Sequence, residues 1–398
     1  MRTSYRDIVL LACCQALLLV NNSGLIAMNG LVGYGLVDNK IFATVGVTSY
    51  VLGSALAAMP AALWMARVGR RRGFMTGSII AIAGSALCAL GIARASFALY
   101  CLGTGVIGIY TAFGLQYRFA AAEVSAPEFK ARAISLVLAG GIVGGFIGPS
   151  ASLWAKDLFP TPFLGSFVVL SAIALVALAV QSRVRVPTPS AAERAGPSRP
   201  LREIAAQPAF IVAVLAAALG YGIMNLLMTA TPLAMSFCGH PFAAAALVIE
   251  WHVVGMYAPG FVTGSLIKRF GTLRIIVAGA ALMALCVAIA LSGTSIGQFT
   301  AALMVLGVGW NFMYTGGTTL LTETYTPAEK ARTQGLNDAI VFGVMLLSSF
   351  SSGALVSAAG WEQMNVGALP LLVVVGAAAG WLAWMRARGA GAAGTAAP

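Results

Sequence analysis

The sequence predicts an all-α membrane protein in which twelve transmembrane helices form two related six-helix bundles. Of its 398 residues, 59% are hydrophobic and 9% are charged, whereas soluble proteins carry about 25% charged residues. Apolar runs long enough to span a bilayer recur along the chain, and a segment of the first half is repeated in the second. No phosphate loop or dinucleotide-binding motif occurs in the loops. We therefore expect a protein that is not an enzyme.

Twelve apolar runs lie between charged residues or Pro, Gly and Asn breaks. A membrane-spanning helix needs about 20 mainly apolar residues, and each run approaches or exceeds that length. The first run has no small-residue cleavage site after a short core, so we expect it to be retained. The runs are 7–31, 41–66, 74–92, 97–120, 132–153, 162–183, 208–234, 242–266, 275–292, 297–320, 333–357 and 366–385.

The basic residues predict the orientation of these helices. The formal net charge is +12, and Lys and Arg in short loops stay on the cytoplasmic side. With both termini inside, only Lys40, Arg94 and Lys156 fall on the opposite side, with Arg118 near a helix end. The positive charge is therefore a topology signal and not a nucleic-acid surface. We expect a multi-pass protein of the bacterial cytoplasmic membrane with both termini in the cytoplasm.

Composition divides the chain. Residues 184–207 are rich in Pro, Ser, Ala and Arg, which is typical of a linker. This places one six-helix bundle at 1–183, a cytoplasmic linker at 184–207 and a second bundle at 208–386. The tail, 387–398, is of low complexity, and we expect it to be disordered.

An internal repeat relates the two halves. EVSAPEFKARAISLVLA (123–139) aligns with ETYTPAEKARTQGLNDA (323–339), LGTGVIGIYT (102–111) with LGVGWNFMYT (306–315), and ARVGRRRG (66–73) with KRFGTLRI (268–275). Duplicated halves are typical of secondary transporters that rock about a central site.

With these features, the chain resembles the major facilitator superfamily over essentially its whole length. The loop pattern of that family, G-x-x-x-D-R-x-G-R-R, is partly present at Arg67, Gly69 and Arg70, which the resemblance makes candidates for gating. Its acidic position is Ala66 in the first half and Lys268 in the second. The charge pair that the family forms there is therefore expected to be altered.

Sulfur and imidazole side chains cluster in the seventh and eighth runs. Met224 and Met228 are four residues apart, as are His252 and Met256, so each pair lies on one helix face. If the two faces meet, the four side chains form a ladder. Thioether and imidazole donors without carboxylates suit copper(I). An alternative is that the methionines fill the core and the histidine bonds a neighbouring helix.

Further soft donors are expected at the outer mouth, where Met235, Cys238 and His240 would serve entry. MTATPLAMSFCGH and VIEWHVVGM resemble the CcoA-type branch of the superfamily, the bacterial copper importers that supply respiratory oxidase assembly. This resemblance implies a redox role at the mouth as well, with Cys238 as the best-placed match. The resemblance implies import of copper, as an ion or chelate, by alternating access. It places the metal on Met224, Met228, His252 and Met256, with no resident cofactor and with a cytoplasmic copper acceptor as a partner.

Two other functions stay open. Members resembling riboflavin transporters share the flanking sequence, and a carrier of an organic solute, flavin-like or drug-like, would use aromatic and polar side chains. The candidates are Trp251, Trp310, Tyr110, Tyr314, Asn225 and Asn311. A copper sensor or assembly partner would bind metal without transporting it.

Ionisable residues within the apolar runs are functional candidates because burying them in a membrane is costly. Glu250 lies in the eighth run and Asp338 in the eleventh, and either could couple transport to protons. Arg118, near the inner end of the fourth run, is expected to belong to an inner gate. The competing interpretation of Asp338 is a hydrogen bond that packs helices together.

Overall fold

The computed structural model describes residues 3–38, 42, 45–187 and 197–394. Within these residues, twelve helical segments are long and apolar enough to cross a membrane. Each coincides with one of the predicted runs, so the all-helical, twelve-span fold class is confirmed. By the contacts between its helices the chain forms two compact units, residues 1–198 with 327–346, and residues 199–326 with 347–398.

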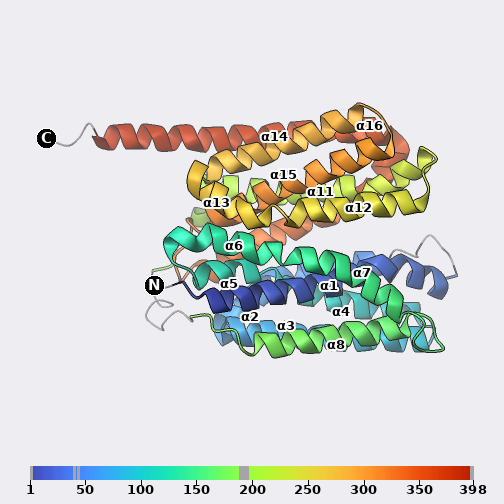
Figure 1. Ribbon diagram of the computed structural model, residues 1–398. Coiled ribbons are helices and arrows are strands. Elements are labelled where there is room, and N and C mark those ends of the chain that lie inside the picture. Colours follow the sequence, from blue (N-terminus) through green and yellow to red (C-terminus); the bar gives the residue numbers. More distant parts are fainter. Residues whose placement is uncertain (1–2, 39–41, 43–44, 188–196, 395–398) are drawn as a thin grey trace. The chain divides into compact units, whose positions relative to one another are not determined.

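Unit 1 is a helical bundle in which several spans are interrupted (Figure 1). The fourth span is divided into α4 and α5, and the fifth begins with a 3₁₀ turn and continues through two helices. The elements are α1 (Tyr5–Leu36), α2 (Val45–Val68), α3 (Arg70–Ala93), α4 (Phe97–Gly114), α5 (Tyr117–Glu123), η2 (Pro127–Phe129), α6 (Lys130–Ala139), α7 (Gly141–Ala155) and α8 (Leu164–Gln181), together with the first part of α16.

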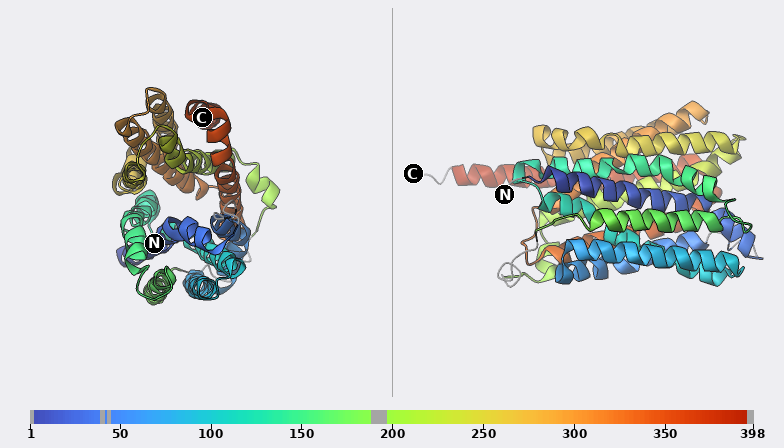
Figure 2. Two further views of the ribbon diagram at one scale, coloured as in Figure 1. Left: turned by 90° about the vertical axis from the view of Figure 1, so that its right-hand side faces the viewer. Right: turned by 60° about the horizontal axis from the view of Figure 1, so that its bottom comes forward.

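Unit 2 is a second bundle, and its helices are seen end-on in the left view of Figure 2. Its eighth span bends between α12 and α13, where Pro259 has no N–H for the helical hydrogen-bond pattern. The elements are α10 (Leu201–Ala205), α11 (Pro208–Phe237), α12 (Phe242–Tyr257), α13 (Gly260–Phe270), α14 (Thr272–Leu291), α15 (Ile296–Leu321) and the rest of α16 (Lys330–Gly394).

One helix is central to the packing of each unit. In unit 1, α4 packs against both α2 and α3, and in unit 2, α15 packs against α11, α12 and α14. The two helices carry the aligned segments 102–111 and 306–315, which are rich in glycine. Small residues allow helix backbones to approach closely in a membrane, where packing replaces the hydrophobic driving force.

The repeat also appears in the backbone of two loops. Gly69 before α3 has φ 87° and ψ 159°, and Gly271 before α14 has φ 89° and ψ 151°. This region of backbone space is essentially restricted to glycine. The aligned sequences 66–73 and 268–275 therefore give the same turn between consecutive helices.

The structure differs from the predicted segment boundaries at two places. Helix α16 continues to Gly394, with a non-helical backbone at Gly360, so it enters the segment predicted to be a disordered tail; residues 395–398 lie outside the described residues. Residues 327–346, which the repeat assigns to the second half, pack into unit 1. The predicted linker contains the short helix α10, and its residues 188–196 also lie outside the described part.

Candidate functional site

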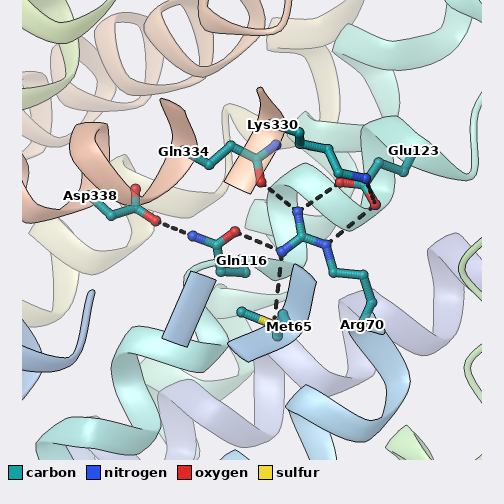
Figure 3. A network of polar contacts seen from close by, with 7 residues as sticks. All are labelled: Met65, Arg70, Gln116, Glu123, Lys330, Gln334 and Asp338. Carbon is teal, nitrogen blue, oxygen red and sulfur yellow. Dashed lines mark hydrogen bonds and ion pairs between the residues drawn. The ribbon is translucent and has the colours of Figure 1, made fainter. Parts of the chain in front are cut away.

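A polar network lies inside unit 1, where the first part of α16 meets α3 and α5 (Figure 3). Lys330, Gln334 and Asp338 of α16 are four residues apart and therefore share one helix face. All three bond to side chains from the first 123 residues. Side-chain contacts over two turns of α16 thus attach its first part to the other helices of unit 1.

Arg70 occupies the centre of this network. Its Nη2 donates to Glu123 Oε1 at 2.7 Å and its Nε to Glu123 Oε2 at 3.3 Å. Its Nη1 donates to Gln116 Oε1 at 2.8 Å, and Nη2 also donates to Gln334. The residue is 7% exposed. A planar guanidinium presents several donors in fixed directions, so one arginine joins α3, α5 and α16.

Glu123 forms ion pairs with two basic residues. Besides its contact with Arg70, its Oε2 lies 3.1 Å from Lys330 Nζ. The acidic position of the family loop pattern is Ala66 here, and the carboxylate that Arg70 contacts comes instead from the end of α5. The expected alteration of the charge pair is therefore seen as a three-residue ion cluster in which Lys330 contributes a second positive charge.

The deepest part of the network is an ion pair between Arg118 and Asp338. Both side chains are 1% exposed. Asp338 also accepts Gln116 Nε2 at 2.6 Å and Asn337 Nδ2 at 3.0 Å. Removing one member of a buried ion pair leaves an uncompensated charge, which costs about 3–5 kcal/mol. The pair is thus a strong local constraint on α5 and α16.

A break in the fourth span positions two of these side chains. Helix α4 ends at Gly114 and α5 begins at Tyr117, with a turn through Leu115 and Gln116. Gln116 then bridges Arg70 and Asp338, while Arg118 follows two residues later. Both turn residues keep right-handed helical dihedral angles, so the span continues through the turn and places Gln116 and Arg118 on the network.

The structure groups some of the predicted coupling and gating residues and separates others. Arg118, Asp338 and Arg70 belong to one network, and Gly69 is the N-cap of α3. Arg67 is exposed, and Glu250 is an exposed residue of α12 in unit 2. Sequence reasoning missed Gln116, Glu123, Lys330 and Gln334. The four-residue spacing of 330, 334 and 338 was the available signal.

The predicted soft donors all lie in unit 2. Met224 and Met256 are buried, at 2% and 6% exposure, and Met228 of α11 is partly buried. His252 is fully buried on α12, and its Nδ1 lies 2.7 Å from the carbonyl oxygen of Leu303 on α15. Its Nε2 is buried and has no hydrogen-bond partner among the described residues.

Helix α12 is held closely against α15 at this level. Asn311 of α15 donates to the Met256 carbonyl at 2.7 Å and accepts the Thr263 hydroxyl at 2.7 Å. A Cβ at Gly307 would lie 2.6 Å from both the His252 carbonyl oxygen and the Met256 nitrogen. The segment that carries His252 and Met256 therefore packs on α15, while the four-donor ladder stays a prediction.

The three residues predicted at the outer mouth differ in accessibility. Met235 is fully buried, Cys238 is exposed at the end of α11, and His240 is partly buried. His240 Nε2 lies 2.6 Å from the Thr294 carbonyl oxygen. Among the described residues, no group of three or more His, Cys, Asp and Glu side chains is arranged to hold a metal ion.

An aromatic cluster gathers on α15 in unit 2. Trp310 and Tyr314 are stacked, with centroids 5.1 Å apart and planes inclined by 16°. Tyr221 of α11 meets both rings edge-on at 5.4 Å, and Tyr257 meets Trp310 at 5.8 Å. Trp310 Nε1 is buried with no hydrogen-bond partner in the described part of the chain. Trp310, Tyr314 and Tyr257 are buried, at 2%, 1% and 6% exposure, and Tyr221 is partly exposed.

The other members of the predicted aromatic and polar pocket are dispersed. Asn311 adjoins Trp310 in sequence and bonds α12 and α13, whereas Asn225 bonds Ser348 and Ser349 of α16 at 2.9 and 2.7 Å. Trp251 is 44% exposed, and Tyr110 is buried in unit 1. Tyr221 and Tyr257 were missed because their proximity to Trp310 depends on packing between helices.

Twelve apolar helices in two bundles, with buried charge within the spans, define a multi-pass membrane protein over the residues that the structure describes. The family described as the Major Facilitator Superfamily matches residues 11–251 and 242–397. The chain belongs to this superfamily of secondary transporters, which are carriers and not enzymes.

Individual relatives agree with this assignment. The chain is 41% identical over 375 residues to the riboflavin transporter RfnT of Brucella anthropi, covering 93% of this chain and 94% of that protein. It is 28% identical over 348 residues to the uncharacterized transporter YddS of Bacillus subtilis, covering 83% and 79%. The fold matches the fucose:proton symporter FucP of E. coli with a TM-score of 0.75 at 18% identity, covering 96% and 99%.

Proposed function

We propose that the protein carries a flat organic solute of the riboflavin type across the membrane by alternating access. The observation that carries this proposal is the 41% identity to a riboflavin transporter over 93% of the chain. It supports the organic-solute alternative better than the copper import favoured by the sequence motifs. None of the relatives named above is described as a copper importer.

The aromatic cluster supports the same substrate class. Riboflavin combines a planar fused ring system with a chain of hydroxyl groups, and aromatic rings stack on or meet such planes edge-on. Tyr221 is partly exposed and meets the buried rings of Trp310 and Tyr314 edge-on. Ligand sites are mostly apolar with a few placed polar groups, and Tyr221 is the member of the cluster that a solute can reach in this structure.

The test is riboflavin uptake in bacteria that cannot synthesise riboflavin and lack their own carrier. Cells expressing the intact chain should accumulate labelled riboflavin, and a Tyr221→Leu/Trp310→Leu variant should lose about tenfold or more of this activity, because each lost aromatic contact contributes about 0.5–1.5 kcal/mol beyond its buried area. Trp381→Leu is the matched control, since Trp381 is 45% exposed on α16. Equal uptake by all three proteins would show that the aromatic cluster is not the riboflavin-binding site.

Energy coupling is part of this proposal. Asp338 is the carboxylate proposed to exchange the coupling proton, with Arg118, Gln116 and Asn337 as its partners. Arg67, Gly69 and Arg70 are proposed to act at the adjacent gate. Glu250 is the competing carboxylate. If the Asp338→Asn variant accumulates solute with unchanged pH dependence, Asp338 is not the coupling carboxylate, and Glu250 becomes the candidate.

Copper is the second candidate substrate. The observation that favours it is the fully buried His252, whose Nε2 has no hydrogen-bond partner among the described residues. A neutral imidazole nitrogen is a good ligand for copper. Copper accumulation by the intact chain, lost in a His252→Leu/Met228→Leu variant of equal abundance, would support this function, and a cytoplasmic copper acceptor would then be the proposed partner.

The cellular setting completes the proposal. The excess of basic residues on one side supports a location in the bacterial inner membrane with both termini in the cytoplasm. Reporter domains fused after Arg388 should be active only when they are of a kind that functions in the cytoplasm.

A further inference from the structure

The eleventh span carries four serines within five residues, in the part of α16 that belongs to unit 2. A serine in a helix can donate its hydroxyl hydrogen to a carbonyl of the preceding turn. Ser351 does so, with its Oγ 2.7 Å from the Leu347 carbonyl oxygen, and Ser352 donates to the Ser349 carbonyl at 3.0 Å. These two hydroxyl groups are therefore bonded within their own helix.

The other two serines of this segment bond a different helix. Asn225 of α11 donates its amide nitrogen to the Ser348 hydroxyl at 2.9 Å and to the Ser349 hydroxyl at 2.7 Å. Asn225 is 7% exposed, whereas both serines are partly exposed. The side chains of α11 and α16 thus form a polar group that is accessible on its serine side.

The direction of one hydroxyl group follows from this contact. A hydroxyl has one hydrogen to donate and two lone pairs that accept. Because Ser349 accepts from Asn225, its own O–H points away from that nitrogen, and it reaches no acceptor among the residues that the structure describes. Asn225 therefore holds Ser349 with one donor and one lone pair available to a ligand.

This polar group lies one helical turn from the aromatic cluster, in the same unit. Asn225 and Tyr221 are four residues apart on α11, so they share one helix face and are separated by about 6 Å along the axis. Tyr221 is the partly exposed member of the cluster and meets Trp310 and Tyr314 edge-on. One face of α11 therefore presents an aromatic ring and, one turn along, an amide bonded to two hydroxyl groups.

We propose that Ser349, positioned by Asn225, recognises the hydroxyl chain of a flavin-type solute, an inference that rests on the proposed function. With the solute ring against Tyr221, a short chain attached to the ring extends along α11 to the level of Asn225. The Ser349 O–H donates to one hydroxyl oxygen of the chain, and its second lone pair accepts from another. Such a site favours a solute that has neighbouring hydroxyl groups over the flat ring alone.

The test compares riboflavin with lumiflavin, which has the same ring and a methyl group in place of the hydroxyl chain. Uptake of labelled riboflavin gives the concentration for half-maximal uptake, and competition by lumiflavin gives its concentration for half-inhibition. In Ser349→Ala the riboflavin value should rise about three- to tenfold, as expected for loss of one hydrogen bond. The lumiflavin value should stay unchanged, because lumiflavin has no hydroxyl group to bind.

Three further variants make the test specific. Ser349→Thr keeps the hydroxyl group and should keep both values. Ser351→Ala is the matched control, because it removes a hydroxyl group that bonds the Leu347 carbonyl of its own helix. Asn225→Ala should act like Ser349→Ala, since Ser349 is then free to donate to its own helix. It is also an independent variant, should Ser349→Ala not reach the membrane.

The outcomes separate this inference from the proposed function. If both values rise by the same factor in Ser349→Ala and Asn225→Ala, these residues only pack α11 on α16, and the inference is overturned while riboflavin transport stands. An unchanged riboflavin value in both variants, or no competition by lumiflavin in the intact chain, would overturn it as well. If the intact chain is present in the membrane and takes up no riboflavin, the proposed function itself fails, and this inference fails with it.

Discussion

Arg118 and Asp338 form an ion pair in which each side chain is 1% exposed, although the residues are 220 positions apart in the chain. Gln116 connects this pair to Arg70, and Glu123 connects Arg70 to Lys330. A continuous series of polar contacts therefore runs from the buried carboxylate of Asp338 to Lys330. These contacts hold the first part of α16 against α3 and α5.

The buried ion pair should behave as a coupled unit. Asp338→Asn and Arg118→Gln should each lower the free energy of unfolding by about 3–5 kcal/mol, because each leaves one charge buried without its partner. The double variant should lose much less than the sum of the two. Detergent unfolding curves of the four proteins check this, and strictly additive losses would show that the two side chains do not interact.

The ion cluster at Glu123 should be unequal in its contributions. Glu123→Gln leaves Arg70 without its carboxylate and should cost about 1–3 kcal/mol. Lys330→Met should cost less than Glu123→Gln, because Arg70 keeps its bonds to Glu123, Gln116 and Gln334 when Lys330 is removed. The same unfolding curves measure both values. A larger loss for Lys330→Met than for Glu123→Gln would contradict the central place of Arg70.

The repeated glycine turn predicts a backbone effect. Gly271→Ala should lower the free energy of unfolding by about 1–3 kcal/mol, because its φ of 89° is strained for any side chain even though a Cβ there meets nothing within 4 Å. Gly376→Ala is the control, since Gly376 is helical and a Cβ there also meets nothing within 4 Å. It should be neutral or slightly stabilising. Equal losses at both positions would exclude backbone strain as the cause.

The contact between α12 and α15 predicts a steric effect. Gly307→Ala inserts a methyl group against the backbone of His252 and Met256, so the helices must separate. We expect a loss of about 1–3 kcal/mol in stability together with reduced solute uptake. Gly297→Ala on the same helix meets only Ser295 Oγ at 3.9 Å and serves as the control. A Gly307→Ala protein with unchanged stability would mean that the helices are not closely packed there.

The sequence predicted the twelve spans well because each depends only on a local run of apolar residues. Its loop pattern also located Gly69 and Arg70 at the start of α3. The partners of Arg70 could not be found in this way. Glu123, Gln116 and Gln334 come from distant segments, and polar residues near the end of a span are common for reasons of solvation alone.

The candidate substrate site was harder to predict than the fold. The pairs Met224/Met228 and His252/Met256 are separated by one helical turn, but spacing along one helix does not determine which neighbouring helix it faces. The bond from His252 to Leu303 and the crowding at Gly307 place this part of α12 against α15. The copper ladder therefore stays a prediction, and the riboflavin-type solute is proposed from similarity over the whole chain.

Counterflow in liposomes tests the central claim most directly. Purified protein is reconstituted into vesicles loaded with unlabelled riboflavin, and the entry of labelled riboflavin is followed over time. The account predicts transient accumulation above protein-free vesicles, strongly reduced in the Tyr221→Leu/Trp310→Leu variant and retained in Trp381→Leu. Entry no faster than in protein-free vesicles, from a preparation with a cooperative thermal unfolding transition, would contradict riboflavin transport.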